Sequence, residues 1–267
     1  MPRSLDLVGS VALVTGASRG LGHAFAEALR SSGATVATCD ELPGSDAVVD
    51  VSDPAQLHAF IESVLTKHGR LDIVVANAAR CRFTNPMSGW DTAIDDFDFH
   101  INTNLRGLFL TGRATMAALA ATGNGHLILL GTDHTCRPLD WPYASGSLDA
   151  YDASKWGVVG LTVAWANALA KKGVRVNALS MGATDTEMLR NFTVAATGRE
   201  PTEEMIAGWM RPEQLADLAL ELIAEGPDGR TGQNIAIIVG QPIELPASSQ
   251  PVTTNMVVLG HRKTGET

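Results

Sequence analysis

The sequence predicts an α/β protein built as one doubly wound parallel sheet of about seven strands, with helices on both faces. Short runs of valine, isoleucine, leucine and alanine recur along the 267 residues without polar alternation, which is typical of parallel strands buried on both faces. Segments with helical periodicity separate these runs, and such an alternation folds into a sheet between two helical layers. Because the chain contains no linker, repeat or low-complexity stretch, we expect one domain over residues 1–245 and a C-terminal extension at 246–267.

The composition and charge of the chain exclude several classes of protein. Hydrophobic residues make up 45% and charged residues 18%, which is too apolar for a disordered chain. A formal net charge of −9 disfavours nucleic acid or an anionic membrane as a partner. No apolar run approaches the roughly 18 residues of a membrane span, and no convincing signal-peptide cleavage site is present. The three cysteines lack metal-ligand spacing, so we expect reduced thiols in a cytoplasmic protein.

Seven apolar runs account for the expected strands. Each run is short and is bounded by turn residues or by a segment with helical periodicity. The expected strands are residues 11–15, 35–40, 48–51, 71–77, 126–131, 174–180 and 234–240.

Helical segments fill the intervals between these runs. The segment at 53–69 places Asp53 as an N-cap and Pro54 at the first helical position. One face of this helix is apolar with the spacing i, i+3, i+4, i+7, i+8, at Leu57, Phe60, Ile61, Val64 and Leu65. Further helices are expected at 23–33, at about 95–121 and at 151–173.

A glycine-rich segment, TGASRGLG, occupies the turn between the first strand and the first helix. Its glycines, Gly16, Gly20 and Gly22, permit a tight turn and a close approach of a pyrophosphate to the amides of a helix N-terminus. A glycine-rich turn alone can bind nothing, but this one lies where dinucleotide sites occur. Asp40 ends the second strand, where a carboxylate can accept hydrogen bonds from the adenosine ribose. These features predict a dinucleotide cofactor.

The segment YDASK places Tyr151 and Lys155 one helical turn apart on the same face. A free phenol has a pKa near 10, so it is a poor general base near pH 7. An ammonium within about 4–6 Å lowers such a pKa by one to three units. On an arbitrary helix, such a pair is an exposed contact between neighbouring side chains without a function. Beside a cofactor site, it predicts that Lys155 makes Tyr151 acidic enough to move protons.

In combination, these motifs resemble the short-chain dehydrogenase/reductase family over nearly the whole chain. The matching segments are TGxxxGxG at Gly16, Gly20 and Gly22, the acid Asp40, the adenine-contacting pair Asp50 and Val51, ANAA at 76–79, Asn104, YxxxK at Tyr151 and Lys155, and SMGATDT at 180–186.

The resemblance implies a Rossmann-type domain, a nicotinamide cofactor and hydride transfer between an alcohol and a carbonyl. It implies that Asn104, Thr132, Tyr151 and Lys155 are catalytic, with Lys155 also holding the nicotinamide ribose and Asn104 anchoring a water. The nicotinamide amide would meet the backbone of Thr184 and the side chain of Thr186. The residues implied in cofactor binding are Gly16, Ser18, Arg19, Gly20, Leu21, Gly22, Asp40, Asp50, Val51, Asn77, Ala78, Ala79, Tyr151, Lys155, Gly182, Thr184 and Thr186.

The chain departs from the family pattern at three positions. Ala79 replaces a glycine, Met181 replaces a proline, and Thr132 stands where the family has a catalytic serine. Thr132 also carries a hydroxyl, so we expect it to replace that serine. The segment before Tyr151 is longer than is usual in the family, and its Ser145 and Ser147 remain rivals for this role, as does Asp133.

Two segments are expected to recognise the substrate. The first is a lid at about 187–211, whose apolar residues include Met188, Phe192 and Trp209. The second is the longer loop that carries Trp141 and Tyr143. Both favour a small, largely apolar secondary alcohol or ketone. Asp133 and His134 are only two possible metal ligands, so no metal is predicted.

Three functions remain open at this point. The leading hypothesis is an NAD-dependent alcohol dehydrogenase or ketone reductase. Arg19 hints instead at an NADPH-dependent oxoacyl reductase, but Asp40 and Glu41 would repel a 2′-phosphate. The missing serine allows a catalytically silent cofactor sensor, although Asn104, Tyr151 and Lys155 are all retained.

The resemblance also implies a homo-oligomer, with a tetramer favoured. In the family the subunits pair through the two long helices that here carry the catalytic asparagine and tyrosine. The stretch GVVGLTVAWANALA is apolar on more than one face, which is more than contact with a single sheet requires.

Overall fold

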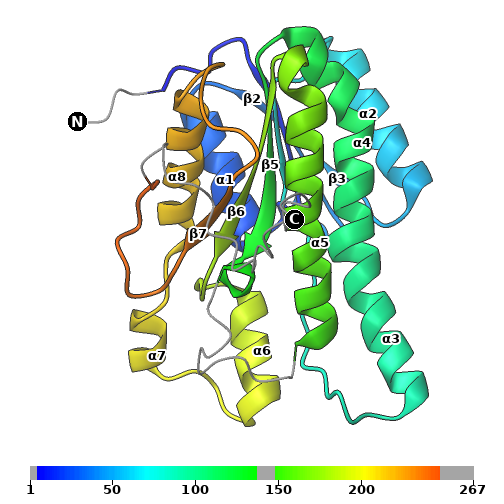
Figure 1. The fold of residues 1–267 in the computed structure, drawn as a ribbon, viewed down its shortest axis with the longest axis vertical. Helices are drawn as coiled ribbons and strands as arrows, with labels where there is room; N and C mark the ends of the chain where they lie inside the picture. Colours follow the sequence, from blue (N-terminus) through cyan, green and yellow to red (C-terminus); the bar gives the residue numbers. More distant parts are fainter. Residues whose placement is uncertain (1–4, 137–147, 247–267) are drawn as a thin grey trace, which may run out of the picture.

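The computed structural model describes residues 5–136 and 148–246. Seven parallel strands form one sheet in the order β3-β2-β1-β4-β5-β6-β7 (Figure 1), which confirms the predicted fold class. The strands are β1 Val11–Thr15, β2 Thr35–Asp40, β3 Ala47–Val48, β4 Ile73–Ala76, β5 Gly125–Thr132, β6 Val174–Met181 and β7 Asn234–Ile237. The expected extension at 246–267 lies outside the described residues except for Pro246, and the domain boundary at 245 stays a prediction.

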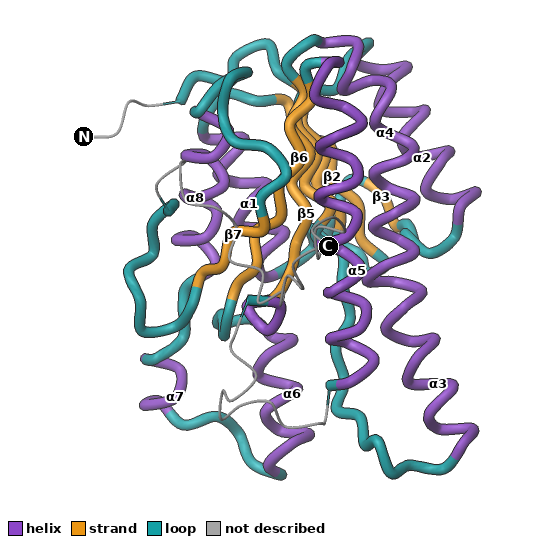
Figure 2. Tube along the Cα trace, viewed as in Figure 1, coloured by secondary structure: helices purple, strands orange, loops and turns teal. Residues whose placement is uncertain are grey.

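Helices cover both faces of the sheet (Figure 2). One layer consists of α1 and α8, and the other of α2, α4 and α5. The helices are α1 Gly20–Ser31, α2 Pro54–His68, α3 Trp90–His100, α4 Leu108–Thr122, α5 Asp149–Leu169, α6 Glu187–Thr197, α7 Glu203–Ala207 and α8 Pro212–Ala224. None of the helices in the described residues is long and apolar enough to span a membrane.

The residues of β1 show why these strands are apolar throughout. Successive side chains of a strand point to opposite faces. Ala12 and Val14 join the hydrophobic cluster under α1 and α8, whereas Val11 and Leu13 join the cluster under α2, α4 and α5. A strand covered on both faces therefore has no position for an exposed side chain.

The strand order places a crevice beside β1. The chain runs outward from β1 through β2 to β3, and then returns to pair β4 on the other edge of β1. Open parallel sheets bind ligands at such a reversal, outside the carboxyl ends of the strands. The carboxyl ends of β1, β2, β4, β5 and β6 all lie at this edge, so every predicted motif that follows a strand meets here.

Several strand ends differ from the sequence-based bounds. β3 ends at Val48 rather than at residue 51, because residues 50–53 form a turn in which the Asp53 amide donates to the Asp50 carbonyl (3.0 Å). β4 ends before Asn77, whose amide donates to the Thr15 hydroxyl instead of continuing the ladder. β7 stops at Ile237, where its pairing with β6 ends.

The predicted helix at about 95–121 is three segments. α3 begins earlier, at Trp90, and a π-helical turn, Ile101–Gly107, separates it from α4. Such π-helical turns occur frequently at functional sites, and this one contains Asn104. The predicted N-cap of α2 is confirmed, since the Asp53 carboxylate accepts hydrogen bonds from the amides of Ala55 and Gln56.

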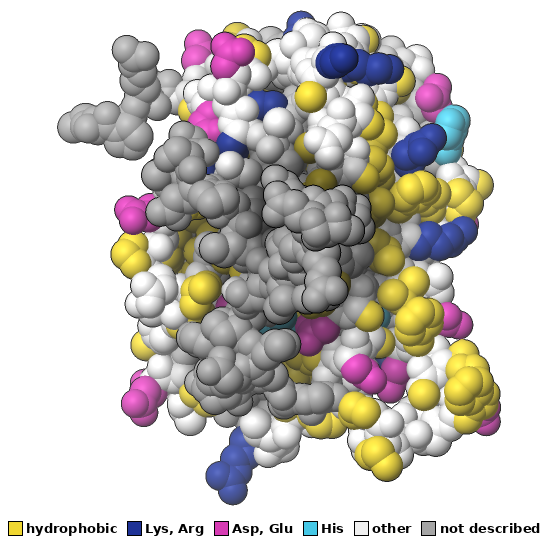
Figure 3. Space-filling view, viewed as in Figure 1, with side chains coloured by type: hydrophobic (Ala, Val, Ile, Leu, Met, Phe, Trp, Pro, Cys, Tyr) yellow, Lys and Arg dark blue, Asp and Glu magenta, His cyan; other side chains and the backbone are white. Residues whose placement is uncertain are grey.

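Hydrophobic side chains gather on the side of the molecule that carries α3, α4 and α5 (Figure 3). The exposed ones include Trp90 and Phe97 of α3, Phe109 of α4, and Trp156 and Val163 of α5. Nothing else in residues 5–136 and 148–246 covers them.

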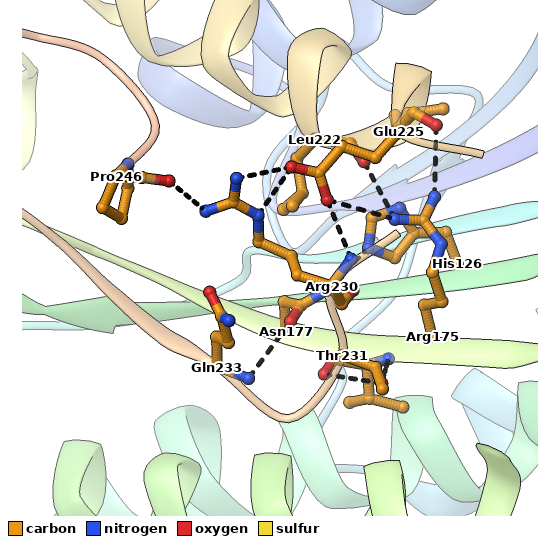
Figure 4. A network of polar contacts seen from close by, with 11 residues as sticks. His126, Arg175, Asn177, Leu222, Glu225, Arg230, Thr231, Gln233 and Pro246 are labelled. Atoms are coloured by element: carbon orange, nitrogen blue, oxygen red, sulfur yellow. Dashed lines mark hydrogen bonds and ion pairs between the residues drawn. The ribbon is translucent and has the colours of Figure 1, made fainter. Parts of the chain in front are cut away.

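A buried network of polar side chains lies at the amino end of β6 (Figure 4), at the opposite end of the sheet from the crevice beside β1. Glu225, which follows α8, accepts a hydrogen bond from Arg230 Nε (2.6 Å), while Arg175 of β6 donates to the Leu222 carbonyl (3.0 Å). Arg230 Nη1 also donates to the carbonyl of Pro246 (2.8 Å). The network therefore ties α8, β6 and the segment after β7 together.

Candidate active site

A cavity of about 730 Å³ opens at the carboxyl ends of the strands. Its wall combines the glycine turn, the ends of β2, β4, β5 and β6, the π-helical turn, α5 and the α6–α7 segment. Of the seventeen residues predicted to bind the cofactor, all except Ser18 line it. Ser18 instead donates to the Asp40 carboxylate through its amide (3.0 Å) and its hydroxyl (2.7 Å).

The glycine turn leaves room for a phosphate. A Cβ at Gly22 would lie 2.0 Å from the Gly16 carbonyl oxygen, and Gly16 has φ 67°, which favours glycine. The Asn77 amide group crosses from the end of β4 and donates to the carbonyls of Thr15 (3.0 Å) and Gly16 (2.9 Å). No side chain caps the N-terminus of α1 in the described residues, and no acid lies in its first turn. This geometry fits the pyrophosphate of a dinucleotide.

The adenosine end of the cavity is acidic. Asp40 is buried at the end of β2, and its carboxylate is oriented by Ser18 and by the Leu42 amide (3.0 Å). Glu41, next to it on the wall, forms an ion pair with Arg80. A ribose hydroxyl fits beside Asp40 as a donor, which agrees with the role that the sequence predicts for it.

Thr132, Tyr151 and Lys155 meet at the other end of the cavity. Thr132 ends β5, and its side chain lies beside the Tyr151 phenol, whose pKa it lowers. Lys155 lies one turn further along α5, with Nζ 5.7 Å from the centroid of the Tyr151 ring and 2.8 Å from the Leu130 carbonyl oxygen, to which it donates. The structure therefore brings together three of the four residues predicted to be catalytic.

Asn104, the fourth, lies behind the cavity wall and is fully buried. Its Oδ1 accepts from the Arg80 amide (2.7 Å), and its Nδ2 donates to the Arg80 carbonyl (2.9 Å) and to Ser154 Oγ (3.2 Å). Ser154 in turn donates to the Tyr151 carbonyl (2.6 Å). Asn104 thus fixes both the turn after β4 and the first turn of α5, and its predicted water contact stays a prediction.

The pKa of Tyr151 shifts opposite to the direction that the sequence suggested. Burial is the main cause and raises the pKa of the phenol, Cys81 and Asp152 raise it further, and the hydrogen bond with Thr132 opposes them. Burial also lowers the pKa of Lys155, to about 8, so this ammonium is itself destabilised. The prediction that Lys155 lowers the pKa of Tyr151 is wrong for the protein without a cofactor. The sequence does not reveal how deeply the two side chains are buried.

The predicted lid forms one wall of the substrate end. Met188 and Phe192 of α6 line the cavity, as does Trp209 after α7. The Thr186 side chain caps α6 by accepting from the Leu189 amide. Trp141 and Tyr143, like Ser145 and Ser147, lie outside the described residues.

Several lining residues were not predicted from the sequence. Thr103 and His134 are two of them, and each lies within two positions of a predicted catalytic residue, Asn104 or Thr132. Ser154 was missed although it lies on the same helix as Tyr151. Sequence proximity could have indicated all three. The sequence offers His134 only as one of two possible metal ligands, and residues 5–136 and 148–246 contain no group of three or more such ligands.

Comparison with known proteins settles the family. The sequence model of the family described as enoyl-(acyl carrier protein) reductase matches residues 16–240. The chain belongs to the short-chain dehydrogenase/reductase family. It is therefore an oxidoreductase of a family that binds a nicotinamide cofactor.

Two curated relatives illustrate the similarity. The chain is 30% identical over 249 residues to the 3-oxoacyl-[acyl-carrier-protein] reductase FabG of Thermotoga maritima, a match that covers 87% of this chain and 98% of the relative. It is 31% identical over 256 residues to the oxidoreductase UcpA of Escherichia coli K12, with coverage of 86% and 93%.

Solved structures share the same fold. Levodione reductase superposes with a TM-score of 0.77 at 26% identity, covering 86% of this chain and 96% of that one. The 3-ketoacyl-(acyl-carrier-protein) reductase of Brucella melitensis, solved with NADH, gives a TM-score of 0.72 at 26% identity, with coverage of 88% and 99%.

Proposed function

We propose that this protein is an NAD-dependent oxidoreductase that transfers a hydride between the nicotinamide and a small, largely apolar secondary alcohol or ketone. The observation that carries the cofactor choice is the pairing of both arginines near the adenosine end with carboxylates. Arg19 Nη1 lies 2.5 Å from Glu187 Oε1, and Arg80 pairs with Glu41.

A 2′-phosphate needs a cation, and in the part of the chain that the structure describes both arginines near that end are already paired with carboxylates. Asp40 is 9% exposed and already accepts three hydrogen bonds, so it stays beside the ribose. Two negative groups brought together out of water are unfavourable. A ribose 2′-hydroxyl can instead donate to a carboxylate, which supports NAD over NADP.

The chain's own residues support a proton-transfer role at the opposite end. Tyr151 Oη is held as a phenol by burial, so it is ready to give its proton to a carbonyl oxygen as that oxygen becomes an alkoxide. Thr132 orients Oη, and Asn104 with Ser154 fixes the backbone of Tyr151. The nicotinamide, when bound, supplies or accepts the hydride. In the oxidative direction, the cationic nicotinamide would favour the ionised phenol.

An oxoacyl-carrier reductase is the second candidate, because relatives such as FabG carry that name. The charges on the cavity wall disfavour an anionic carrier arm. Among the described residues of the wall, the acidic ones are Asp40, Glu41, Asp50, Asp133, Glu187 and Glu204, and the strongly basic ones are Arg19 and Lys155. The whole chain also has a formal net charge of −9. Like charges reduce both encounter rate and affinity.

The decisive experiment measures kcat/KM with NADH and with NADPH on a panel of apolar ketones and on an acetoacetyl thioester. NADH and the ketones should give the higher values, and a preference for NADPH would overturn the cofactor assignment. Tyr151→Phe is the control, because it should retain NADH binding and lose roughly 10²–10⁴-fold in rate. A wild-type protein that binds NADH but reduces nothing would support the silent sensor.

A further inference from the structure

The substrate end of the cavity contains a polar pair that the chemistry above does not use. His134 lies in a short 3₁₀ turn, Asp133–Thr135, two residues after Thr132, and Asp152 follows Tyr151 directly on α5. His134 Nδ1 is 2.8 Å from Asp152 Oδ1. The pair therefore lies next to Thr132 and Tyr151 along the chain.

Asp152 determines which nitrogen of His134 is available. The carboxylate accepts the proton of Nδ1, so Nε2 is left on the other side of the ring. Nε2 has no hydrogen-bond partner within residues 5–136 and 148–246. His134 lines the cavity, and its ring stands edge-on to the Tyr151 ring, with centroids 6.4 Å apart. A ligand held at the phenol is therefore within reach of the imidazole.

The surroundings of His134 select for a neutral ligand group. The α6–α7 segment adds mainly apolar side chains to the wall of the same cavity, namely Met188, Leu189, Phe192, Met205 and Trp209. The carboxylate of Glu204 lies on the same wall and would repel an anionic substrate. A hydroxyl group fits best, since it can donate to neutral Nε2 and accept from protonated Nε2.

We propose that His134, oriented by Asp152, binds a second oxygen of the substrate, and that the preferred substrates are neutral α-hydroxy ketones and the matching vicinal diols. This rests on the proposed function. The reacting oxygen meets Tyr151 and Thr132, and the hydroxyl on the adjacent carbon meets Nε2, because the two rings lie close enough for neighbouring oxygens to span them.

The redox balance is that of any ketone reduction. One hydride from the reduced nicotinamide goes to the carbonyl carbon, and one proton from Tyr151 Oη goes to the carbonyl oxygen, which gives a vicinal diol. His134 forms no bond with the substrate and exchanges no electrons. It acts on specificity alone.

The first test compares acetophenone with α-hydroxyacetophenone as substrates, using NADH. The ratio of kcat/KM values, hydroxylated over plain, should fall about tenfold in His134→Leu relative to the wild type, as expected for one lost hydrogen bond. His134→Gln, whose amide can donate and accept, should recover part of the ratio. Comparing variants cancels the intrinsic reactivity of the two ketones, and an unchanged ratio in His134→Leu overturns the proposal.

The second test does not depend on turnover. Styrene glycol and phenylethanol are titrated into the enzyme with NADH bound, and cofactor fluorescence reports binding. The wild type should bind the glycol about tenfold more tightly, and His134→Leu should bind the two alcohols equally. A wild type without this preference overturns the inference even if no variant folds. A wild type that reduces neither ketone but keeps the preference contradicts the proposed function alone.

Discussion

At the scale of single residues, burial of Lys155 lowers the stability of the fold at neutral pH. The side chain is 3% exposed, and the lost contact with water lowers its pKa from the ordinary 10.5 to about 8. Between these two values the unfolded chain binds more protons than the folded one. The free energy of unfolding therefore rises with pH in this window.

We predict that this contribution disappears in Lys155→Met. Relative to the variant, the unfolding free energy of the cofactor-free wild type should rise by about 3 kcal/mol between pH 8 and pH 10.5, since each pKa unit corresponds to about 1.4 kcal/mol. Urea unfolding of both proteins at several pH values measures the difference. Two stability curves that stay parallel through this window would contradict the prediction.

Thr132 carries a second prediction at this scale. Its hydroxyl lies beside the Tyr151 phenol, where the family's serine is expected, so Thr132→Ser should keep most of the activity. Thr132→Val has nearly the same shape without the hydroxyl, and it should lose at least roughly 10–100-fold in kcat. Steady-state kinetics on one ketone compares them. An active Thr132→Val enzyme together with an inactive Ser147→Ala enzyme would assign the serine's role to the longer segment before Tyr151.

At the scale of elements, the glycine turn depends on one close contact. A methyl group at Gly22 would collide with the Gly16 carbonyl oxygen at 2.0 Å, and that oxygen already accepts a hydrogen bond from Asn77. Gly22→Ala should therefore displace the turn and weaken NADH binding at least tenfold. Fluorescence titration measures the affinity. Gly89→Ala is the matched control, because a Cβ there meets no atom within 4 Å, and equal losses in both variants would refute the argument.

The elements also show what a sequence can predict. Each strand was predictable because its residues are apolar on both faces, which is a local pattern. The ends of β3 and β4 were not, since a turn at Asp50–Asp53 and the bonds of Asn77 to the glycine turn decide them, and both depend on chain geometry. The π-helical turn at Ile101–Gly107 has no compositional signature at all.

The residues of the site also fall into those that a local pattern predicts and those that only the fold brings together. The glycines, Tyr151 and Lys155 belong to motifs with fixed spacing, so the sequence located them. His134 and Asp152 are eighteen positions apart, and only the fold brings them into contact. The predicted direction of the Tyr151 pKa shift was wrong for a related reason. Desolvation of the phenol arises from the tertiary structure, which the local sequence does not show.

At the scale of the whole molecule, one face of α5 is exposed and uncharged along most of its length. Its exposed residues recur every three or four positions and are uncharged over about four turns. From position 153 to position 168 they are Ala153, Trp156, Gly160, Val163, Ala164, Asn167 and Ala168. Trp156 and Val163 are each 48% exposed. An apolar patch of this kind marks an interface.

We propose that a second copy of the chain covers this face, in a homo-oligomer for which a tetramer is favoured. Two copies of one stripe can pack against each other about a two-fold axis, and the small residues Ala153, Gly160 and Ala164 allow close approach. Light scattering at micromolar concentration should then give a multiple of the 28.1 kDa chain mass for the wild type. Val163→Glu should shift the mass toward one chain, because it buries an unpaired carboxylate in the interface. Val8→Glu, at another exposed apolar position, should leave the assembly intact. A wild type of 28.1 kDa, or a Val163→Glu protein that assembles like the wild type, would exclude this face as the contact.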